Sequence, residues 1–127
     1  MADKLIAVVD DDASVRSATV DLLVSVGFAC EAFEAAEEYL RSEAANRTAC
    51  LILDVRMPGL NGLELQRLLA EQGRAVPIIF ITSYPNERAR RRAIRGGAIC
   101  YLPKPYSEEE LLGCIRLSLH GSGLKGP

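Results

Sequence analysis

Short apolar runs alternate along this chain with longer amphipathic stretches. Five segments predict strands, at residues 5–9, 28–33, 50–53, 78–81 and 99–102, of which the second is interrupted by Glu31. The run Leu5–Val9 contains no polar residue, which is typical of a strand covered on both faces of its sheet. Between the runs, apolar residues recur at helical intervals, first as Val15, Ala18, Thr19, Leu22, Leu23 and Val26.

Local signals predict where the helices begin and end. Helices are expected near residues 15–26, 35–44, 61–69, 86–95 and 107–119. Gly27 directly follows the first apolar stripe and predicts a C-terminal cap. Two residue pairs have the spacing of a capping box, namely Asn61 with Glu64 and Ser107 with Glu110.

This alternation of five strands and five helices predicts the α/β class. Successive strands of such a chain pair in parallel through right-handed crossovers, which gives a doubly wound sheet with helices on both faces. Ligands of these sheets bind beyond the carboxyl ends of the strands, where the strand order reverses. The residues that follow each apolar run are therefore the first place to look for chemistry.

Acidic, hydroxyl and basic side chains follow four of the five runs. They are Asp10, Asp11 and Asp12 after the first run, Asp54 after the third, Thr82 and Ser83 after the fourth, and Lys104 before Pro105 after the fifth. Carboxylates crowded at one sheet edge repel strongly, and a hard divalent cation removes this cost. Mg²⁺ fits such oxygen ligands best. A bound cation would draw a phosphoryl group to the edge, where Asp54 is placed as a nucleophile towards phosphorus.

These motifs resemble the receiver domain of two-component response regulators. The resemblance rests on Val8–Asp12, Asp54–Gly62, Ile81–Ser83 and Tyr101–Pro105, and it covers about residues 4–120. Its key positions follow one another at intervals of 43, 28 and 22 residues, from Asp11 to Asp54, Thr82 and Lys104. The details are most similar to receivers of the FixJ/NarL type, which belong to transcriptional regulators. The resemblance implies a flavodoxin-like parallel sheet of strand order 2-1-3-4-5.

The resemblance also implies what the site binds. Asp54 would accept a phosphoryl group from the phosphohistidine of a sensor histidine kinase. The ligands of Mg²⁺ would be Asp10, Asp11, Asp54 and the backbone carbonyl of Arg56. Beyond this self-catalysed transfer and the later autodephosphorylation, the chain would not be an enzyme.

Other residues would respond to the phosphoryl group. Thr82 and Lys104 would contact its oxygens, Thr82 and Tyr101 would act as the switch pair, and a cis peptide bond would join Lys104 to Pro105. Arg56 and Tyr84 each lie two residues past a motif residue. Their bulk would screen the phosphoryl group from water, which predicts slow autodephosphorylation.

Simpler interpretations exist for several of these residues. Acidic residues are common at a helix N-terminus, and Asp12 is expected to be only a cap. Thr82 could be an ordinary β-branched strand residue, and Tyr101 could serve packing as well as switching. His120 is interpreted as a cation near the end of the last helix and not as a phosphodonor.

Two other functions compete with the receiver hypothesis. A phosphatase with an aspartate nucleophile would need a second aspartate two residues further on, but Arg56 stands there. An interaction module without phosphate chemistry would not need the complete set of motif residues. Within the receiver family, the chain could be the control domain of a transcriptional regulator, a stand-alone interaction module or a phosphorelay carrier.

Composition limits the kinds of partner and the cellular location that are expected for this chain. The chain has 127 residues, is 49% hydrophobic and 25% charged, and carries a net charge of −2. This balance gives no general footprint for nucleic acid, so direct nucleic-acid binding is not expected. The apolar runs are too short to span a membrane, and no secretory signal is visible, so a cytoplasmic location is expected. Residues 1–120 are expected to form the receiver domain, and residues 121–127 a flexible tail or the start of a linker.

The charged residues are not evenly distributed along the chain. Residues 86–95 hold five arginines and only one acidic residue, Glu87, whereas Glu108–Glu110 are all acidic. A run of this kind is usually a solvated helix face. The alternative is a homodimer through the fourth helix, fifth strand and fifth helix, in which Arg88, Arg91, Arg92 and Arg95 of one copy face Glu108 and Glu109 of another.

The four cysteines indicate no further chemistry. They lie at positions 30, 50, 100 and 114, without a C-x-x-C pair or a nearby histidine. Neither a zinc site nor a redox motif is expected from this spacing. Reduced and mostly buried thiols are the prediction.

Overall fold

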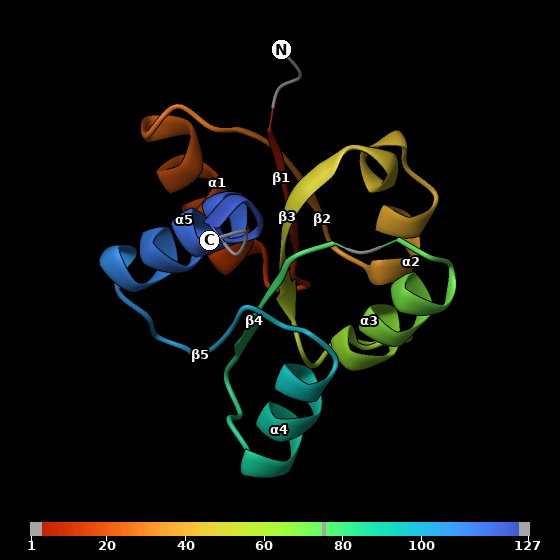
Figure 1. Ribbon diagram of the computed structural model, residues 1–127. Coiled ribbons are helices and arrows are strands. Elements are labelled where there is room, and N and C mark those ends of the chain that lie inside the picture. The colour runs from red at the N-terminus through yellow and green to blue at the C-terminus, as the bar shows by residue number, and fades with distance from the viewer. Residues whose placement is uncertain (1–3, 75, 125–127) are drawn as a thin grey trace.

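Five parallel strands form the centre of the computed structural model, which describes residues 4–74 and 76–124, with side chains as far as residue 120. The strands lie in the order β2-β1-β3-β4-β5 (Figure 1). Their bounds are β1 (Leu5–Val9), β2 (Ala29–Phe33), β3 (Thr48–Asp54), β4 (Ile78–Thr82) and β5 (Cys100–Pro103). The sheet confirms the predicted parallel order, with β1 next to β3 at the point where the order reverses.

Helices cover both faces of this sheet. They are α1 (Ala13–Ser25), α2 (Ala36–Leu40), the 3₁₀ helix η1 (Glu43–Asn46), α3 (Gly62–Glu71), α4 (Glu87–Arg95) and α5 (Glu108–Leu124). In Figure 1, α1 and α5 lie on one side of the strands, and α2 and α3 lie on the other. The doubly wound α/β fold is therefore confirmed.

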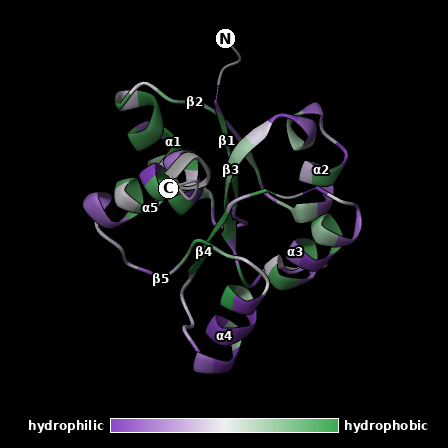
Figure 2. Ribbon diagram, in the orientation of Figure 1, coloured by the Kyte–Doolittle hydropathy of each residue, from purple (hydrophilic) through white to green (hydrophobic). Residues whose placement is uncertain are grey.

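The central strands are apolar throughout because both of their faces are covered. Along β1, Leu5, Ala7 and Val9 pack with α2, α3 and α4, while Ile6 and Val8 pack with α1 and α5. All five side chains are buried. Figure 2 shows the resulting contrast between the apolar sheet and the hydrophilic outer surface of α4.

Two helices differ from their predicted form. The helix expected over residues 35–44 is divided into α2 and η1, with Ser42 at the N-cap of η1. The predicted stripe on α1 is only partly in the core, because Ala18 and Val26 are exposed. Ala18 lines a cavity of about 510 Å³ between α1 and α5 instead.

The predicted tail overlaps the last helix. Helix α5 continues past residue 120 to Leu124, and residues 125–127 lie outside the described part of the chain. No helix among the described residues has the length and apolar character that a membrane crossing requires.

The prediction that all four cysteines are reduced was wrong for two of them. Cys100 on β5 and Cys114 on α5 form a disulfide, whereas Cys30 and Cys50 are free thiols. The two bonded residues are 14 positions apart in sequence, and they meet because α5 packs against the sheet. A spacing rule based on neighbouring residues could not find this pair.

Candidate functional site

Three carboxylates meet at the carboxyl ends of β1 and β3. Asp10 directly follows β1, and Asp54 is the last residue of β3. Each of Asp10, Asp11 and Asp54 offers a carboxylate oxygen, and these oxygens lie within 4.8 Å of one another. Asp10 and Asp54 are buried, while Asp11 is exposed to solvent. The predicted convergence of these side chains is confirmed.

Lys104 joins the carboxylates from the end of β5. Its Nζ lies 3.0 Å from Asp10 Oδ2 and 3.3 Å from Asp54 Oδ2. Its backbone N–H donates to the carbonyl of Thr82, at 2.7 Å, which fixes the loop after β5 to the end of β4. The Lys104–Pro105 peptide bond is cis, as the resemblance implies.

Burial and charge shift the acid–base equilibria of this cluster. The pKa of Asp54 is raised to about 7, mainly by burial and then by the hydrogen bond and charge of the Asp10 carboxyl, against the opposing effects of Lys104 and the backbone N–H of Arg56. Burial alone would lower the pKa of Lys104, but its hydrogen bond to Asp10 and the charge of Asp54 outweigh this, so the pKa of Lys104 is raised. One ammonium thus holds two buried carboxylates together.

Backbone donors orient the acidic side chains. The N–H of Arg56 donates to Asp54 Oδ1 at 3.2 Å, and the N–H of Asp12 donates to Asp10 Oδ1 at 2.9 Å. Asp12 itself accepts from the first-turn N–H groups of Ser14 and Val15. Its predicted role as the N-cap of α1 is confirmed.

Thr82, Tyr84 and Arg56 lie at or just after the carboxyl ends of β3 and β4, the sheet edge that carries Asp54. Thr82 ends β4 and is fully buried, and its Oγ1 accepts from the N–H of Tyr84 at 3.0 Å. The ring of Tyr84 is exposed, and the guanidinium carbon of Arg56 lies 4.9 Å from the ring centroid. The two side chains that were expected to screen the site therefore contact each other.

Tyr101 lies one residue after Cys100 on β5 but packs on the opposite face of the sheet, among the residues of the α2, α3 and α4 side. Its side chain is half-buried, and its hydroxyl oxygen is buried without a hydrogen-bond partner among the described residues. This position combines packing with an unsatisfied polar atom.

The contact that holds the loop after Asp54 was not predicted from the sequence. Glu37 on α2 accepts from the N–H of Leu60 through Oε2, at 2.9 Å. This backbone hydrogen bond is the main reason that the pKa of Glu37 is lowered. Gly59 has φ +75°, and a Cβ atom there would lie 2.8 Å from the same Glu37 oxygen. Glu37 thus anchors the loop that also carries the carbonyl of Arg56.

Gly62 is required at the start of α3 for a different reason. A Cβ atom at this position would collide with the backbone carbonyl oxygen of Asp54. The N–H of Gly62 also donates to the carbonyl of Val55 at 2.9 Å. The glycine of the Asp54–Gly62 motif therefore allows α3 to approach the end of β3 closely.

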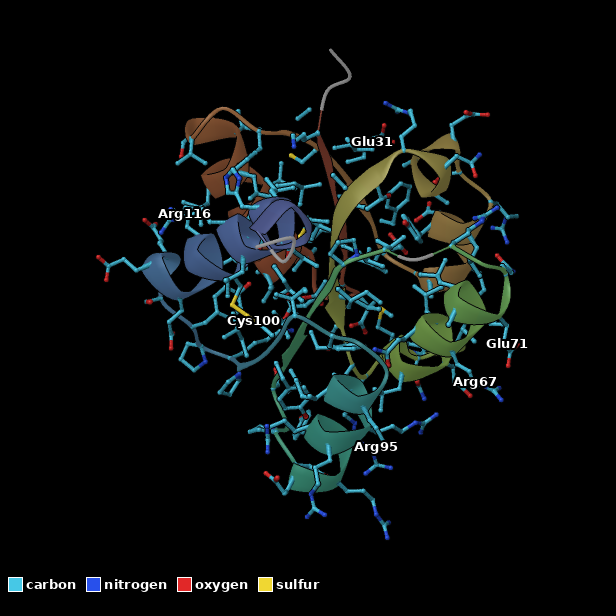
Figure 3. All side chains as sticks on the ribbon, in the orientation of Figure 1. Glu31, Arg67, Glu71, Arg95, Cys100 and Arg116 are labelled. Atoms are coloured by element: carbon cyan, nitrogen blue, oxygen red, sulfur yellow. A yellow bond between two sulfur atoms is a disulfide. The ribbon has the colours of Figure 1, made fainter. Side chains whose placement is uncertain are left out.

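The charged residues proposed for an interface are all exposed. Arg88, Arg91, Arg92 and Arg95 lie on α4, and Glu108 and Glu109 lie in the first turn of α5. Glu87 already pairs with Arg90 and Arg91 within α4. Figure 3 shows the stick side chains of α4, with Arg95 labelled, extending away from the sheet.

The donor set of the acidic cluster fits a hard cation. It consists of carboxylate oxygens, two from buried residues and one from an exposed residue that leaves room for water. No histidine or thiolate belongs to it. Mg²⁺ prefers oxygen ligands and retains several waters, so the cluster suits this ion better than zinc.

Comparison with known proteins gives a consistent result. The family model for the response regulator receiver domain matches residues 6–116. The response regulator protein TodT of Pseudomonas putida is 42% identical over 121 residues, which are 94% of this chain and 53% of TodT. The transcriptional regulatory protein TdiR of Thauera aromatica is 38% identical over 112 residues, 88% of this chain and 49% of TdiR.

A solved structure supports the subfamily as well. The crystal structure of FixJ-N matches with a TM-score of 0.83 and 29% identity, and the match covers 94% of this chain and 96% of FixJ-N. This agrees with the FixJ/NarL type predicted from the motifs. The chain spans about half the length of the curated relatives it matches.

Proposed function

The chain belongs to the response regulator receiver domain family, and from this premise we propose that Asp54 accepts a phosphoryl group from the phosphohistidine of a sensor histidine kinase. The observation that carries the proposal is the contact of the Asp54 carboxylate with Lys104, next to Asp10 and Asp11. A receiver domain is not a classical enzyme. Its chemistry is transfer to its own side chain, followed by hydrolysis.

The transfer step follows from the positions of these groups. An oxygen of the Asp54 carboxylate attacks phosphorus, the P–N bond of phosphohistidine breaks, and its electron pair returns to the imidazole nitrogen. Lys104 and Thr82 bind the oxygens of the phosphoryl group. Asp10, Asp11, Asp54 and the carbonyl of Arg56 would hold Mg²⁺, which neutralises the carboxylates and attracts the phosphoryl oxygens.

Phosphorylation then acts as a switch. Thr82 Oγ1 accepts from Tyr84 N–H in this structure, and a phosphoryl group on Asp54 offers the hydroxyl a charged partner. Movement of Thr82 would change the space available to Tyr101, whose hydroxyl has no partner among the described residues. A change at Asp54 therefore shifts the population of two arrangements of β4 and β5.

We place the output of this switch in transcription. TdiR is named a transcriptional regulatory protein, and the matched part is 49% of its length. By analogy with TdiR, we propose that this receiver domain controls an effector domain, and that the protein is cytoplasmic. A stand-alone phosphorelay carrier is the alternative within the same family.

Phosphorylation can be tested directly with a small-molecule donor. We expect incubation with acetyl phosphate and Mg²⁺ to add one phosphoryl group that hydroxylamine removes, and mass spectrometry to locate it on Asp54. The variant Asp54→Asn should take up none, whereas Asp21→Asn, which changes an exposed acid on α1, should behave like wild type. An adduct on another side chain, or no adduct on the wild type, would contradict the proposal.

The contact between Arg56 and Tyr84 predicts a long phosphoryl lifetime. The two residues lie in the loops that follow β3 and β4, and we propose that their cation–π contact limits the approach of water to Asp54. The double variant Arg56→Ala, Tyr84→Ala is expected to release phosphate about three- to tenfold faster, because loss of an exposed contact of this kind changes a barrier by about 1 kcal/mol. Release can be followed as loss of the phosphorylated mass, with Arg67→Ala on α3 as the control. An equal or slower rate in the double variant would rule out screening.

The charged surfaces of α4 and α5 predict a homodimer of the phosphorylated form. Arg88, Arg92 and Arg95 form no ion pair within the described part of the chain, and Glu108 and Glu109 are exposed. Arg92→Glu is expected to weaken dimerisation about tenfold, and Glu109→Arg to restore part of it. Light scattering of the beryllofluoride complex at about 0.05 M and 0.5 M salt provides the measurement. Dimerisation that is insensitive to salt and to Arg92→Glu would refute this interface.

A further inference from the structure

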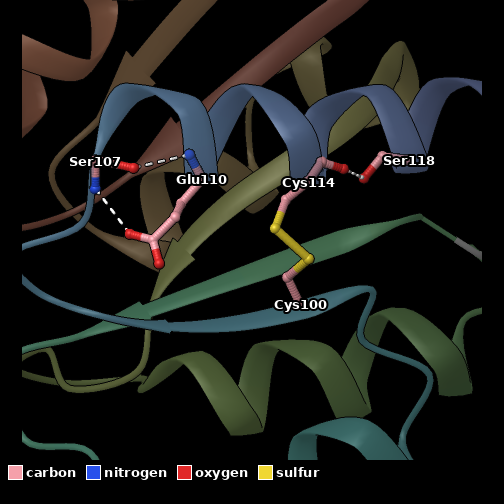
Figure 4. The surroundings of a disulfide bond; sticks show 5 residues. All are labelled: Cys100, Ser107, Glu110, Cys114 and Ser118. Carbon is pink, nitrogen blue, oxygen red and sulfur yellow. Dashed lines mark hydrogen bonds between the residues drawn. A yellow bond between two sulfur atoms is a disulfide. The ribbon is translucent and has the colours of Figure 1, made fainter.

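Two cysteines from different elements are joined where β5 meets α5. Figure 4 shows the bond between Cys100 on β5 and Cys114 on α5. Their Cα atoms are 6.2 Å apart, which lies within the range that a disulfide spans without movement of the backbone. Cys114 is buried, whereas Cys100 is half-buried, so solvent reaches the pair from the β5 side. The fold therefore holds the two cysteines where the disulfide between them can form or break without movement of the backbone.

The segment that this bond closes contains residues of the proposed switch. Between Cys100 and Cys114 lie Tyr101 and Lys104, whose ammonium contacts both Asp10 and Asp54. The same segment carries the capping box of Ser107 and Glu110, which starts α5. The disulfide thus links the two ends of the segment that contains β5, the start of α5 and the lysine of the acidic cluster.

The other two thiols are poor competitors for this reaction. Burial raises the pKa of Cys50 to about 11, so its thiol stays protonated at neutral pH. Burial also raises the pKa of Cys30. Both belong to the same side of the sheet as the bonded pair. Ser118 donates to the carbonyl of Cys114 at 3.1 Å, which fixes that turn of α5 beside the bond (Figure 4).

We propose that Cys100 and Cys114 are a reversible thiol–disulfide pair, and that its oxidation lowers the response of the receiver to phosphorylation at Asp54. The proposal rests on the function proposed above. Disulfides are rare in a cytoplasm that keeps thiols reduced, and those that form there are usually transient and redox-sensing. The oxidised and reduced proteins would then be two working states of one switch.

The oxidant is a small-molecule disulfide of the glutathione class. The thiolate of Cys100, the more accessible of the two, attacks one sulfur of that disulfide and releases a thiolate. The thiolate of Cys114 then attacks the mixed disulfide and releases the second one. The protein loses two electrons and two protons, and the small disulfide is reduced to two thiols. An excess of the reduced thiol reverses both steps.

Closing the segment opposes rearrangement inside it. The disulfide removes conformations in which β5 moves relative to α5, and it leaves those close to the structure described here, in which Thr82 Oγ1 is bonded to Tyr84 N–H. If Tyr101 and Lys104 must shift when a phosphoryl group arrives, the oxidised protein resists the shift. Its affinity for a phosphoryl analogue is therefore lower than that of the reduced protein.

The test compares one chain in two redox states. Wild-type protein is prepared with oxidised glutathione or with dithiothreitol, and peptide mapping identifies the bond. Each form is titrated with beryllofluoride and Mg²⁺, and binding is measured by calorimetry. We expect the oxidised form to bind about fivefold more weakly or worse, and dithiothreitol to restore binding. Cys30→Ser should keep this difference, whereas Cys100→Ser, Cys114→Ser should bind like the reduced protein under both conditions.

Each outcome decides between the two proposals. Equal affinity of the oxidised and reduced wild type, or a mapped bond other than Cys100–Cys114, overturns the redox proposal and leaves the proposed function intact. Absence of beryllofluoride binding in both states overturns the proposed function and the redox proposal with it. The central comparison needs no substitution, so a folding defect in the double serine variant does not affect the conclusion.

Discussion

Replacing Lys104 with methionine is expected to lower the unfolding free energy of the metal-free protein by about 3 kcal/mol near neutral pH, the amount typical of removing one partner of a buried ion pair. The side chains of Asp10, Asp54 and Lys104 are 0%, 7% and 12% exposed, so water cannot replace the ammonium. Methionine keeps the length of the side chain and removes its charge. The buried Asp10 carboxylate would then lose its counter-charge, and Asp54 would hold its proton more tightly because Lys104 opposes the rise of its pKa.

The same substitution is expected to slow phosphorylation of Asp54 by about 100-fold or more. A cation positioned beside the charge that develops on the phosphoryl group lowers the barrier of the transfer by several kcal/mol. Urea unfolding in the presence of a chelator measures the first effect, and the rate of adduct formation from acetyl phosphate measures the second. Lys4→Met changes an exposed lysine just before β1 and serves as the control. A loss of stability no larger than that of Lys4→Met would show that Lys104 does not hold the carboxylates together.

The parts of the structure that the sequence predicted are those with local causes. Asp12 caps α1, and Ser107 pairs with Glu110, because a side chain reaches a backbone group two or three residues away. The continuous apolar runs that form the central strands can also be recognised from the neighbouring sequence alone. From these local signals follow the parallel order and the edge at which Asp54 and Lys104 meet.

What the sequence did not predict depends on contacts between distant segments. Cys100 and Cys114 were expected to be reduced, because nothing in their spacing shows that α5 lies against β5. Glu37 holds the loop after Asp54 from a separate helix, so its role is visible only once the two elements lie side by side. The motif gave the chemical groups of the site, whereas the supports of those groups come from tertiary packing.

Replacing Asp54 with asparagine is expected to stabilise the metal-free protein at alkaline pH and to have little effect near pH 4. The pKa of this carboxyl rises from 3.8 to about 7 in the folded state, so the folded protein holds its proton more tightly than the unfolded chain does. Between about pH 4 and pH 7 the unfolded chain loses this proton while the folded protein keeps it, and stability falls as pH rises, by roughly 4 kcal/mol in total. Asparagine is neutral throughout and removes this loss.

Urea unfolding at about pH 4.5, 6 and 8 in a chelator shows whether the two stability curves diverge as this linkage requires. The difference between Asp54→Asn and wild type should grow with pH and level off above about pH 7, while Asp21→Asn should follow the wild type at every pH. Added Mg²⁺ should stabilise the wild type more than Asp54→Asn, because a ligand that binds only the folded state stabilises it by mass action. Parallel curves for wild type and Asp54→Asn would mean that Asp54 is ionised in the folded protein without cost, and that the carboxylates of the acidic cluster do not repel one another strongly enough for a bound cation to relieve.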